Sequence, residues 1–381
     1  MFKLIKNGEL YSPEYQGYID ILLCMDKVVS IKKRGNISIE GFTEPIQIID
    51  ADGMTIVPGF IDQHVHFLGG GGKLGYASRA GALKFDDIIR FGVTTAISSL
   101  GVDSYLKNLD TLLIRARELG SEGLTAYILT GGFQLPLKSI TGDVYNDLIY
   151  IDKVIGIGEI GLSDSYGSQP NIEEIIRILS NSKAVGALTE KPGIVFIHIG
   201  PGSKGMKLIF DIINNSDLPV KQFVVTHVNR SIELLEEAIK FAKLGGRIDI
   251  TTGISPEFGI EGSITPYDAL NYVFKNSVSI DNVTLSSDAG GFRSVDDNNN
   301  KIDDVLLLSR TLLDTIKESK KRHNIKFSDV LKTITVNPAR IWDLSKKGEI
   351  KTYNDADLVF LDSNDLRIKK VMIKGKIAFE K

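Results

Sequence analysis

Histidine is scarce in this chain, yet two of its five histidines stand one residue apart. His64 and His66 occur in GFIDQHVHFLGGGGK, residues 59–73, at the end of an apolar run. On a β-strand, positions i and i+2 face the same side, so both imidazole rings are expected to point in one direction. His198 in IVFIHIG and His227 in VVTHV also lie near the ends of apolar runs. These four residues are candidate metal ligands.

Two carboxylates occupy similar positions, Glu159 in GIGEIGLSD and Asp288 in TLSSDAGG. Taken singly, each residue has another interpretation: packing for a histidine, a lysine partner for Asp288, a helix cap for Glu159. Together they favour metal binding, because buried charge is costly unless it is paired or bound to a metal. Imidazole and carboxylate suit zinc, with manganese, iron or nickel as alternatives. Six ligands exceed the needs of one catalytic zinc and predict two ions that share a bridging carboxylate.

These ligands can meet only if the strands that carry them are neighbours. Eight apolar runs alternate with segments of helical period, such as 108–120, 171–182, 204–216 and 231–246. The runs lie at 59–67, 93–100, 124–132, 154–162, 194–200, 222–228, 247–254 and 282–291. Runs that are apolar on both faces are typical of buried parallel strands. Residues 57–344 are therefore predicted to form an α/β fold, a (β/α)8 barrel of the TIM type, with its site at the carboxyl ends of the strands.

An open doubly wound sheet is the structural alternative, but it usually has a GxGxxG turn after its first strand. The four glycines at 69–72 open no clear helix. The fifth histidine, His323, lies in the basic stretch KKRHNIKF outside the apolar runs and is expected to be solvated. Residues 1–56 and 345–381 contain short strand-like runs and turns with no helical segment between them, which predicts a small second domain built from both ends.

Composition excludes several classes of function. A net charge of −3 provides no basic surface for nucleic acid. No apolar run approaches the roughly 18 residues that a membrane-spanning helix needs. The amino-terminal stretch turns polar too early for a signal peptide, and the single cysteine, Cys24, cannot form an internal disulfide. A cytoplasmic enzyme with a small-molecule substrate, and without nucleic-acid or membrane partners, is the expectation.

The stretch PGFIDQHVH, together with these histidines and acids, resembles the amidohydrolase superfamily. Within it, LTGGFQLP, KPGIVFIHIG, THVNR and GGRIDIT are similar to isoaspartyl dipeptidases along nearly the whole chain. The resemblance implies that the terminal strands form a small β-sandwich and that the protein is a homo-oligomer.

The resemblance also assigns ligands for two divalent ions, with zinc favoured. His64, His66 and Asp288 would bind the more buried ion, and His198 and His227 the second. The family bridges its ions with a carboxylated lysine on the fourth strand, and Glu159 takes that place here. Asp288 would also be the catalytic residue that takes the proton from the attacking hydroxide and passes it to the leaving nitrogen.

The residues that contact substrate in the family differ more. Lys73 stands where the dipeptidase has a glutamate that binds the substrate α-amino group. Phe133 replaces a catalytic tyrosine, Val102 a threonine and Tyr166 an arginine. Lys73 either points into water or adds a cation to the mouth of the site. In the second case, substrates that are N-acylated or carry two acidic groups are favoured over free dipeptides.

Arg230 in THVNR keeps its place, and its family role is to hold a substrate carboxylate. The family serine that follows the aspartate falls near Phe292, with Ser294 as a possible replacement. Arg230, Lys73, Phe133, Tyr166 and Ser294 are therefore the candidate substrate-binding residues. Relative to the dipeptidases, the metal chemistry is expected to be conserved in this protein, whereas most contacts specific to a dipeptide substrate are expected to be lost.

The sequence thus predicts a binuclear metal-dependent hydrolase that cleaves an amide, or an ester or lactone as a weaker alternative, in a small substrate bearing a carboxylate. A genuine isoaspartyl dipeptidase is the first alternative. A non-catalytic binding protein is the second, although such relatives tend to lose metal ligands. Deamination with one metal is the third, and the carboxylate on the fourth strand disfavours it.

Overall fold

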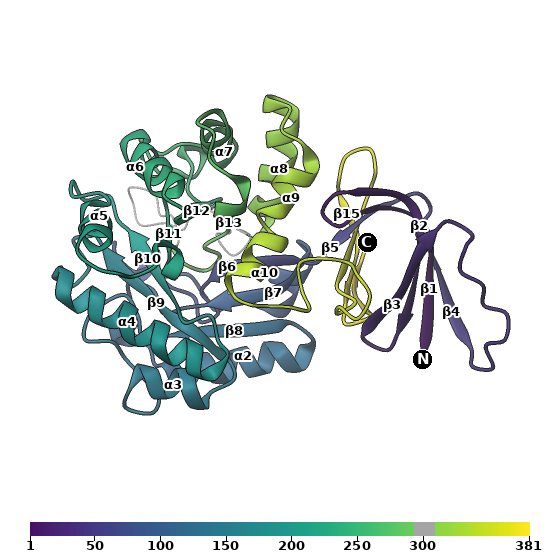
Figure 1. Ribbon diagram of the computed structural model, residues 1–381, viewed down its shortest axis with the longest axis horizontal. Coiled ribbons are helices and arrows are strands. Elements are labelled where there is room, and N and C mark those ends of the chain that lie inside the picture. The colour runs from purple at the N-terminus through teal and green to yellow at the C-terminus, as the bar shows by residue number, and fades with distance from the viewer. Residues whose placement is uncertain (293–308) are drawn as a thin grey trace.

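The computed structural model describes residues 1–292 and 309–381, and Ser294 lies outside the described residues. Two sheets organise the chain, one in the middle of the sequence and one from its two ends (Figure 1). No helix in the described ranges has the length and apolar character to cross a membrane.

The central sheet consists of eight parallel strands in sequence order. They are β6 (Phe60–Val65), β7 (Val93–Ser98), β8 (Thr125–Thr130), β9 (Val154–Leu162), β10 (Ile194–Ile199), β11 (Phe223–Thr226), β12 (Arg247–Thr251) and β13 (Val283–Ser286). A parallel bridge between Val65 and Ala289 brings the last strand back to the first, so the sheet is a nearly closed barrel. Six of these strands are buried along their whole length, which explains why their sequences are apolar on both faces. The eight predicted strands are confirmed.

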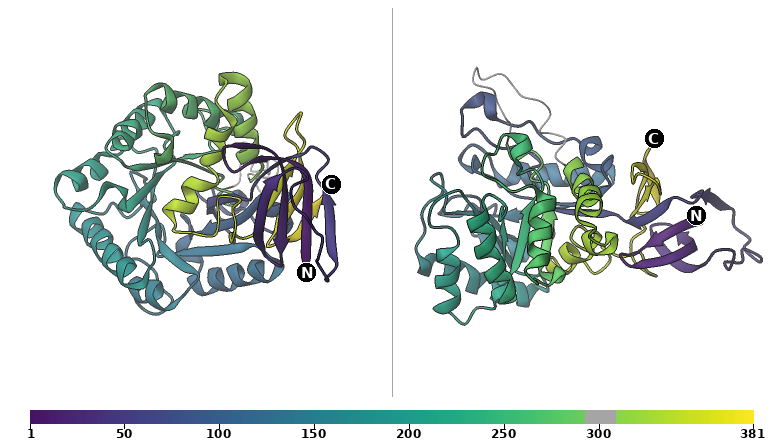
Figure 2. Two further views of the ribbon diagram at one scale, coloured as in Figure 1. Left: turned by 45° about the vertical axis from the view of Figure 1, so that its right-hand side comes forward. Right: turned by 90° about the horizontal axis from the view of Figure 1, so that it is seen from above.

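Helices surround the barrel, as the left view of Figure 2 shows. They are α1 (Phe85–Ile89), α2 (Leu109–Glu122), α3 (Val144–Tyr150), α4 (Ile172–Thr189), α5 (Lys207–Asn214), α6 (Ile232–Lys243), α7 (Pro266–Lys275), α8 (Arg310–His323), α9 (Phe327–Lys332) and α10 (Val336–Ile341). Single 3-10 turns lie at Tyr76–Ser78, Ser104–Leu106, Val220–Gln222, Pro256–Phe258 and Ile280–Asn282.

Local sequence fixes the ends and faces of these helices. Asn171 and Glu174 form a capping box at the start of α4, and Ile175 and Leu179 bury one face of it against the barrel. His323 ends α8, and its Nε2 lies 2.7 Å from Asp268 Oδ1. The prediction that His323 is solvated was therefore wrong, because the end of α8 packs beside α7.

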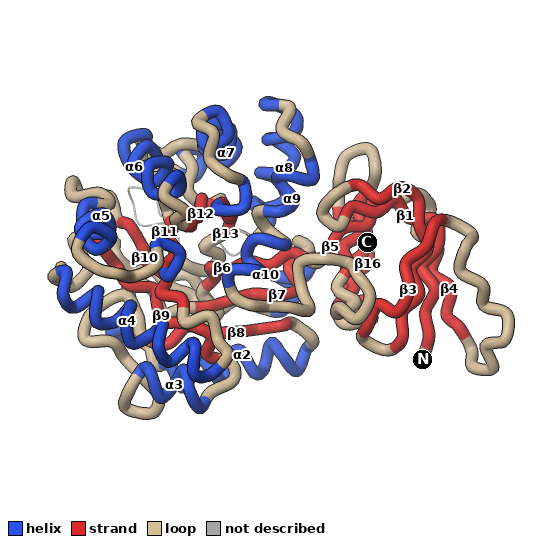
Figure 3. The backbone as a smooth tube through the Cα atoms, viewed as in Figure 1, coloured by secondary structure: helices blue, strands red, loops and turns tan. Residues whose placement is uncertain are grey.

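The second sheet joins the two ends of the chain, as the predicted terminal strands require. Its strands are β1 (Phe2–Tyr11), β2 (Tyr15–Cys24), β3 (Lys27–Lys33), β4 (Ile46–Asp50), β5 (Thr55–Pro58), β14 (Leu358–Leu361), β15 (Ile368–Ile373) and β16 (Lys376–Glu380). They pair in the order β16-β15-β14-β5-β1-β2-β3, with β4 beside β1. We call this group the terminal sheet; Figure 3 shows its strands to one side of the barrel.

Polar side chains from several barrel strands are joined in a buried hydrogen-bond network. Asp249 Oδ1 accepts hydrogen bonds from Gln63 (2.7 Å) and Thr284 (2.8 Å), and its Oδ2 accepts one from Ser286 (2.6 Å). Trp342 directly follows α10, and its Nε1 donates a hydrogen bond to Gln63 Oε1 at 2.9 Å. This network fixes the strands that carry the residues at the mouth, since buried polar groups are rigid when all their bonds are made.

Candidate metal centre

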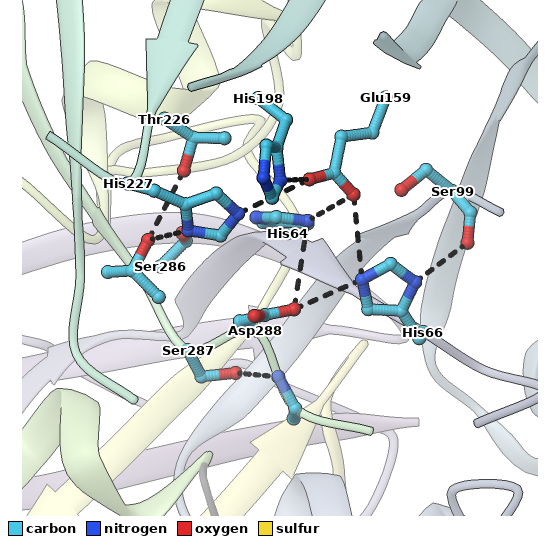
Figure 4. A network of polar contacts seen from close by, with 12 residues as sticks. His64, His66, Ser99, Glu159, His198, Thr226, His227, Ser286, Ser287 and Asp288 are labelled. Atoms are coloured by element: carbon cyan, nitrogen blue, oxygen red, sulfur yellow. Dashed lines mark hydrogen bonds and ion pairs between the residues drawn. The ribbon is translucent and has the colours of Figure 1, made fainter. Parts of the chain in front are cut away.

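All six predicted metal ligands meet at the carboxyl ends of the barrel strands (Figure 4). His64 lies in β6, Glu159 in β9 and His198 in β10, whereas three others come directly after strands: His66 after β6, His227 after β11 and Asp288 after β13. Each has a relative exposure of 7% or less. The sequence prediction that these residues come together is confirmed, because parallel strands end at one edge of the barrel.

Glu159 lies between two pairs of histidines, and each of its oxygens faces one pair. Oε2 is 3.0 Å from His64 Nε2 and 3.7 Å from His66 Nε2. Oε1 is 2.6 Å from His198 Nδ1 and 3.2 Å from His227 Nε2. A carboxylate in this position has one oxygen for each of two adjacent sites.

Asp288 reaches only the first pair. Its Oδ1 is 3.0 Å from His66 Nε2 and 3.8 Å from His64 Nε2. The backbone N–H of Asp288 donates to the His64 carbonyl at 3.0 Å, which ties the last barrel strand to the first. A Cβ at Gly291 would lie 2.0 Å from Asp288 Oδ1, so only glycine fits beside this carboxylate.

The outer ring nitrogens show that the inner ones need a cation. His66 Nδ1 lies 3.1 Å from the Ser99 carbonyl, which can only accept, so Nδ1 carries the proton. His198 Nε2 likewise donates to Asp164 Oδ2 at 3.2 Å. The inner nitrogens of neutral rings would then present lone pairs to the Glu159 and Asp288 carboxylates. Such a contact is repulsive unless a proton or a metal ion lies between, so the donor set fits a metal centre.

The chemistry of the donors agrees with this fit. Two clusters of buried nitrogen and oxygen atoms have all their members within 4.8 Å of one another: His64 with Glu159 and His227, and His64 with His66 and Asp288. Imidazole nitrogen with carboxylate oxygen is a donor set that zinc and related ions prefer. Divalent metal ions are therefore suited to this site.

The protein itself holds the carboxylates ionised. Burial raises the pKa of Asp288, but His64 and His66 outweigh it and bring that pKa down to about 2. Glu159 behaves similarly, since the neighbouring His64 and His198 overcome burial and hold its pKa well below the usual range. Burial lowers the pKa of His64, yet Glu159 and Asp288 raise it to about 9. The pKa of His227 is well below normal because of burial, His198 and Arg230.

Three of the predicted substrate-binding residues, Lys73, Phe133 and Tyr166, lie together beside His198. The ring of Phe133 meets that of His198 edge to face at a centroid distance of 4.7 Å. Tyr166 lies over Lys73, whose Nζ is 4.9 Å from the ring centroid. Gln134 Nε2 donates to the carbonyls of Val102 (2.9 Å) and Tyr166 (3.3 Å). These contacts show that the positions at which the sequence departs from the dipeptidase pattern form one connected cluster.

The site also contains a buried carboxylate, Asp164, that the sequence patterns did not point to. Asp164 follows β9, is 2% exposed, and binds both His198 and Lys73, whose Nζ donates to Asp164 Oδ2 at 2.8 Å. Lys73 is thus neither free in water nor an unpaired cation at the mouth. The signal was present, since Asp164 directly follows a predicted barrel strand, where active-site residues gather.

Arg230 lies three residues after His227 in the chain. Its Nε donates to the Ile199 carbonyl at 3.1 Å, and among the described residues its side chain forms no ion pair. Burial lowers the pKa of Arg230, with Asp288, Asp164 and Glu159 acting in the other direction. A guanidinium keeps its charge in proteins even so, and its terminal nitrogens remain available to an anionic group.

Comparison with known proteins places the chain among hydrolases. Residues 261–378 match the model of the amidohydrolase family. Dihydroorotase of Clostridium acetobutylicum is 23% identical over 95% of this chain and 90% of its own. Dihydroorotase of Lactococcus lactis is 44% identical over 69 residues, but the match spans only 15% of that protein.

Two solved structures are similar over the full length. The β-aspartyl dipeptidase of Fervidobacterium islandicum AW-1 is 37% identical, with a TM-score of 0.89 over 100% of this chain and 99% of that one. Its complex with the dipeptide β-Asp-Leu gives 38% identity and a TM-score of 0.90, over 100% and 98%. At this identity over whole chains, the chain belongs to the amidohydrolase superfamily, alongside the β-aspartyl dipeptidases, and is a hydrolase that acts on amide or peptide bonds.

Proposed function

We propose that the protein is a binuclear metal-dependent hydrolase that cleaves an amide bond in a small substrate bearing a carboxylate. His64, His66 and Asp288 would hold one ion, His198 and His227 the other, and Glu159 both, with zinc as the favoured metal. The single observation that carries this proposal is the position of Glu159, whose two oxygens face different pairs of histidines. When bound, two such ions polarise a carbonyl and lower the pKa of a water molecule.

Asp288 is suited to proton transfer. Its Oδ1 faces His66 and His64, and among the described residues its Oδ2 receives no hydrogen bond. A carboxylate with one oxygen free at the mouth accepts a proton from a water and returns it to a leaving nitrogen within the same site. Phe133 has no hydroxyl to assist at the scissile carbonyl.

Arg230 supports the choice of a carboxylate-bearing substrate. Its guanidinium has one internal hydrogen bond, to Ile199, and lies near the anionic side chains of the centre. A planar fork of donors matches a carboxylate with two parallel hydrogen bonds. Holding one end of the substrate in this way would orient the amide bond over the metal centre.

β-Aspartyl dipeptidase activity is the second candidate. The similarity to the Fervidobacterium islandicum enzyme, including its complex with β-Asp-Leu, favours it. The cluster of Lys73, Phe133 and Tyr166 favours a different substrate, because it brings a lysine and two aromatic rings to the substrate side. Rates with β-Asp-Leu and with N-acetylated amino acids, measured side by side, separate the two candidates.

Glu159→Gln tests the bridge. A neutral amide has one oxygen, and its NH2 group repels a metal ion, so we expect the variant to lose at least one ion of two, and nearly all activity. Elemental analysis of the purified protein measures the metal content. Glu174→Gln, in the exposed capping box of α4, is the matched control. If Glu159→Gln retains two ions, the bridging role is wrong.

Other properties belong to the same proposal. We infer a cytoplasmic homo-oligomer, a domain of residues 57–344 that contains the barrel, and a small β-sandwich domain of residues 1–56 and 345–381. The pairing of β14 from one end of the chain with β5 from the other supports a unit built from both termini. The boundary between residues 56 and 57 falls inside β5, which runs from Thr55 to Pro58.

A further inference from the structure

The ammonium group of Lys73 is enclosed by one carboxylate and two aromatic rings. Its Nζ lies 2.8 Å from Asp164 Oδ2, 4.9 Å from the centroid of Tyr166 and 5.6 Å from that of Phe133. The side chain of Lys73 is one-third exposed, whereas Asp164 is 2% exposed. We call Asp164, Tyr166 and Phe133 the cation cage.

Two members of the cation cage, Asp164 and Phe133, are held in place by residues other than Lys73. His198 Nε2 and the backbone N–H of Tyr166 both donate to Asp164, at 3.2 and 2.9 Å. Phe133 is buried against the ring of His198. A fixed buried carboxylate flanked by aromatic faces binds organic ammonium ions, because the ring quadrupole and the carboxylate both attract positive charge.

Lys73, by contrast, enters the cage from a loop. Gly69, Gly71 and Gly72 before it have positive φ angles of 70°, 83° and 96°, which suit glycine and allow the sharp path of this segment. The backbone of Lys73 is tied to the cage only through its carbonyl, 3.4 Å from the Tyr166 hydroxyl. The Lys73 ammonium therefore occupies the cage from a loop that is separate from the segments that form the cage.

The cage adjoins the metal centre through His198, which contacts both Asp164 and Phe133. We propose that Lys73 fills an ammonium-binding site that is part of the substrate pocket, so that the enzyme selects amides without a free amine at this point. With Lys73 in place, a substrate ammonium meets a positive charge and finds its carboxylate already paired. This inference rests on the proposed function for its consequence in catalysis, but the cage itself does not.

Binding to the emptied cage is the first test. Lys73→Ala removes three methylenes and the ammonium, a volume that n-propylammonium replaces. We expect n-propylammonium to bind Lys73→Ala at least roughly tenfold more tightly than it binds the wild type, as a charge-assisted contact with a buried carboxylate would predict. Isothermal titration calorimetry measures this without turnover, and 1-propanol is the uncharged probe of the same size.

Two further variants separate the cage from a general charge effect. Lys73→Met is one atom shorter than lysine and fills most of the space without charge, so it is expected to bind n-propylammonium no better than the wild type. Lys73→Ala combined with Tyr166→Leu removes one ring and is expected to lose most of the gained affinity. Equal binding of n-propylammonium by the wild type and Lys73→Ala, or equal binding of 1-propanol and n-propylammonium by Lys73→Ala, would overturn the proposal.

The catalytic consequence is tested with a pair of substrates, β-Asp-Leu and its N-acetyl derivative. The wild type is expected to prefer the acetylated amide in kcat/KM, and Lys73→Ala to shift the ratio toward the free amine by at least roughly tenfold. Absence of hydrolysis of both amides by metal-loaded wild type would refute the proposed function and leave the calorimetric result to decide the cage. An unchanged ratio in an active Lys73→Ala would refute selection by Lys73.

Discussion

Asp288 and Glu159 are both buried carboxylates among the same histidines, yet their contacts give them different roles. Glu159 has both oxygens facing histidine nitrogens, at 2.6 to 3.7 Å. Asp288 has one oxygen at His66 and His64, and the other has no hydrogen bond among the described residues. A group with both oxygens facing histidines is poorly placed to carry a proton, so we propose Asp288, and not Glu159, for proton transfer.

Asp288→Asn is expected to lower kcat by roughly 10²- to 10⁴-fold, because the amide cannot accept the proton. Metal content should remain largely unchanged, since the two histidines and Glu159 still serve the first site. Steady-state kinetics with elemental analysis of the same sample checks both parts. Asp268→Asn, at the half-exposed partner of His323, should leave kcat unchanged. Near-normal turnover in Asp288→Asn would remove it from the mechanism.

At the residue scale, the sequence could predict the candidate metal ligands but not which side chains pair with one another. His64, His66 and Asp288 were found because their positions at strand ends follow from local pattern alone. The pairing of Lys73 with Asp164 depends on how a loop after β6 meets a loop after β9, 91 residues away. No local pattern predicts such a long-range contact. The sequence therefore left two alternatives for Lys73, a side chain that points into water or an unpaired cation at the mouth of the site.

At the scale of elements, a buried lysine joins the barrel to the terminal sheet. Lys347 follows α10, and its Nζ lies 2.7 Å from Asp355 Oδ2 and 2.5 Å from Asp357 Oδ2, just before β14. It also donates to Thr125 Oγ1, in barrel strand β8, at 2.9 Å. The Lys347 side chain is 7% exposed, and it is the cation that pairs with Asp357, whereas Asp355 also pairs with Lys27.

Lys347→Met should lower the free energy of unfolding by about 3–5 kcal/mol, because it leaves buried carboxylates without their cation. Lys27 remains near Asp355, and Asp357 is the group left unpaired. Urea denaturation followed by circular dichroism measures the change. Lys351→Met removes a side chain that is 56% exposed and whose partner Glu349 is 35% exposed, so it should change stability little. Equal stability of Lys347→Met and the wild type would show that the aspartates find other partners.

At the scale of the whole molecule, the eight strands and their order followed from the sequence because buried parallel strands must be apolar on both faces. The terminal strands were also recognised, but their pairing was not, since β5 and β14 lie some 300 residues apart in the chain and meet only through the closed barrel. The position of His323 against α7 was missed for the same reason. Contacts within one element are local; contacts between elements require the whole fold.

Removing the metal should change how the stability of the whole protein depends on pH. In the metal-free protein the pKa of His64 is raised to about 9, burial lowering it and Glu159 and Asp288 raising it by more. An unfolded histidine has a pKa near 6.5. The proton is therefore bound more tightly in the folded state, and its stabilisation is complete below pH 6.5 and lost as pH rises through 9. The lowered pKa of His227 makes the folded state less stable as the pH falls below about 6.5, so it does not contribute to the change at higher pH.

Chelator-treated protein should thus lose unfolding free energy, on the order of a few kcal/mol, between pH 6.5 and 9.5, because the pKa of His64 is higher in the folded state than in the unfolded chain. Urea titrations across this range measure the loss. Metal-loaded protein should show no such decline, because a metal-bound His64 nitrogen carries no proton to release. Metal-free His64→Asn should also be nearly independent of pH in this window. A decline of equal size in that variant would place the titrating group elsewhere and contradict the charge cluster described for the centre.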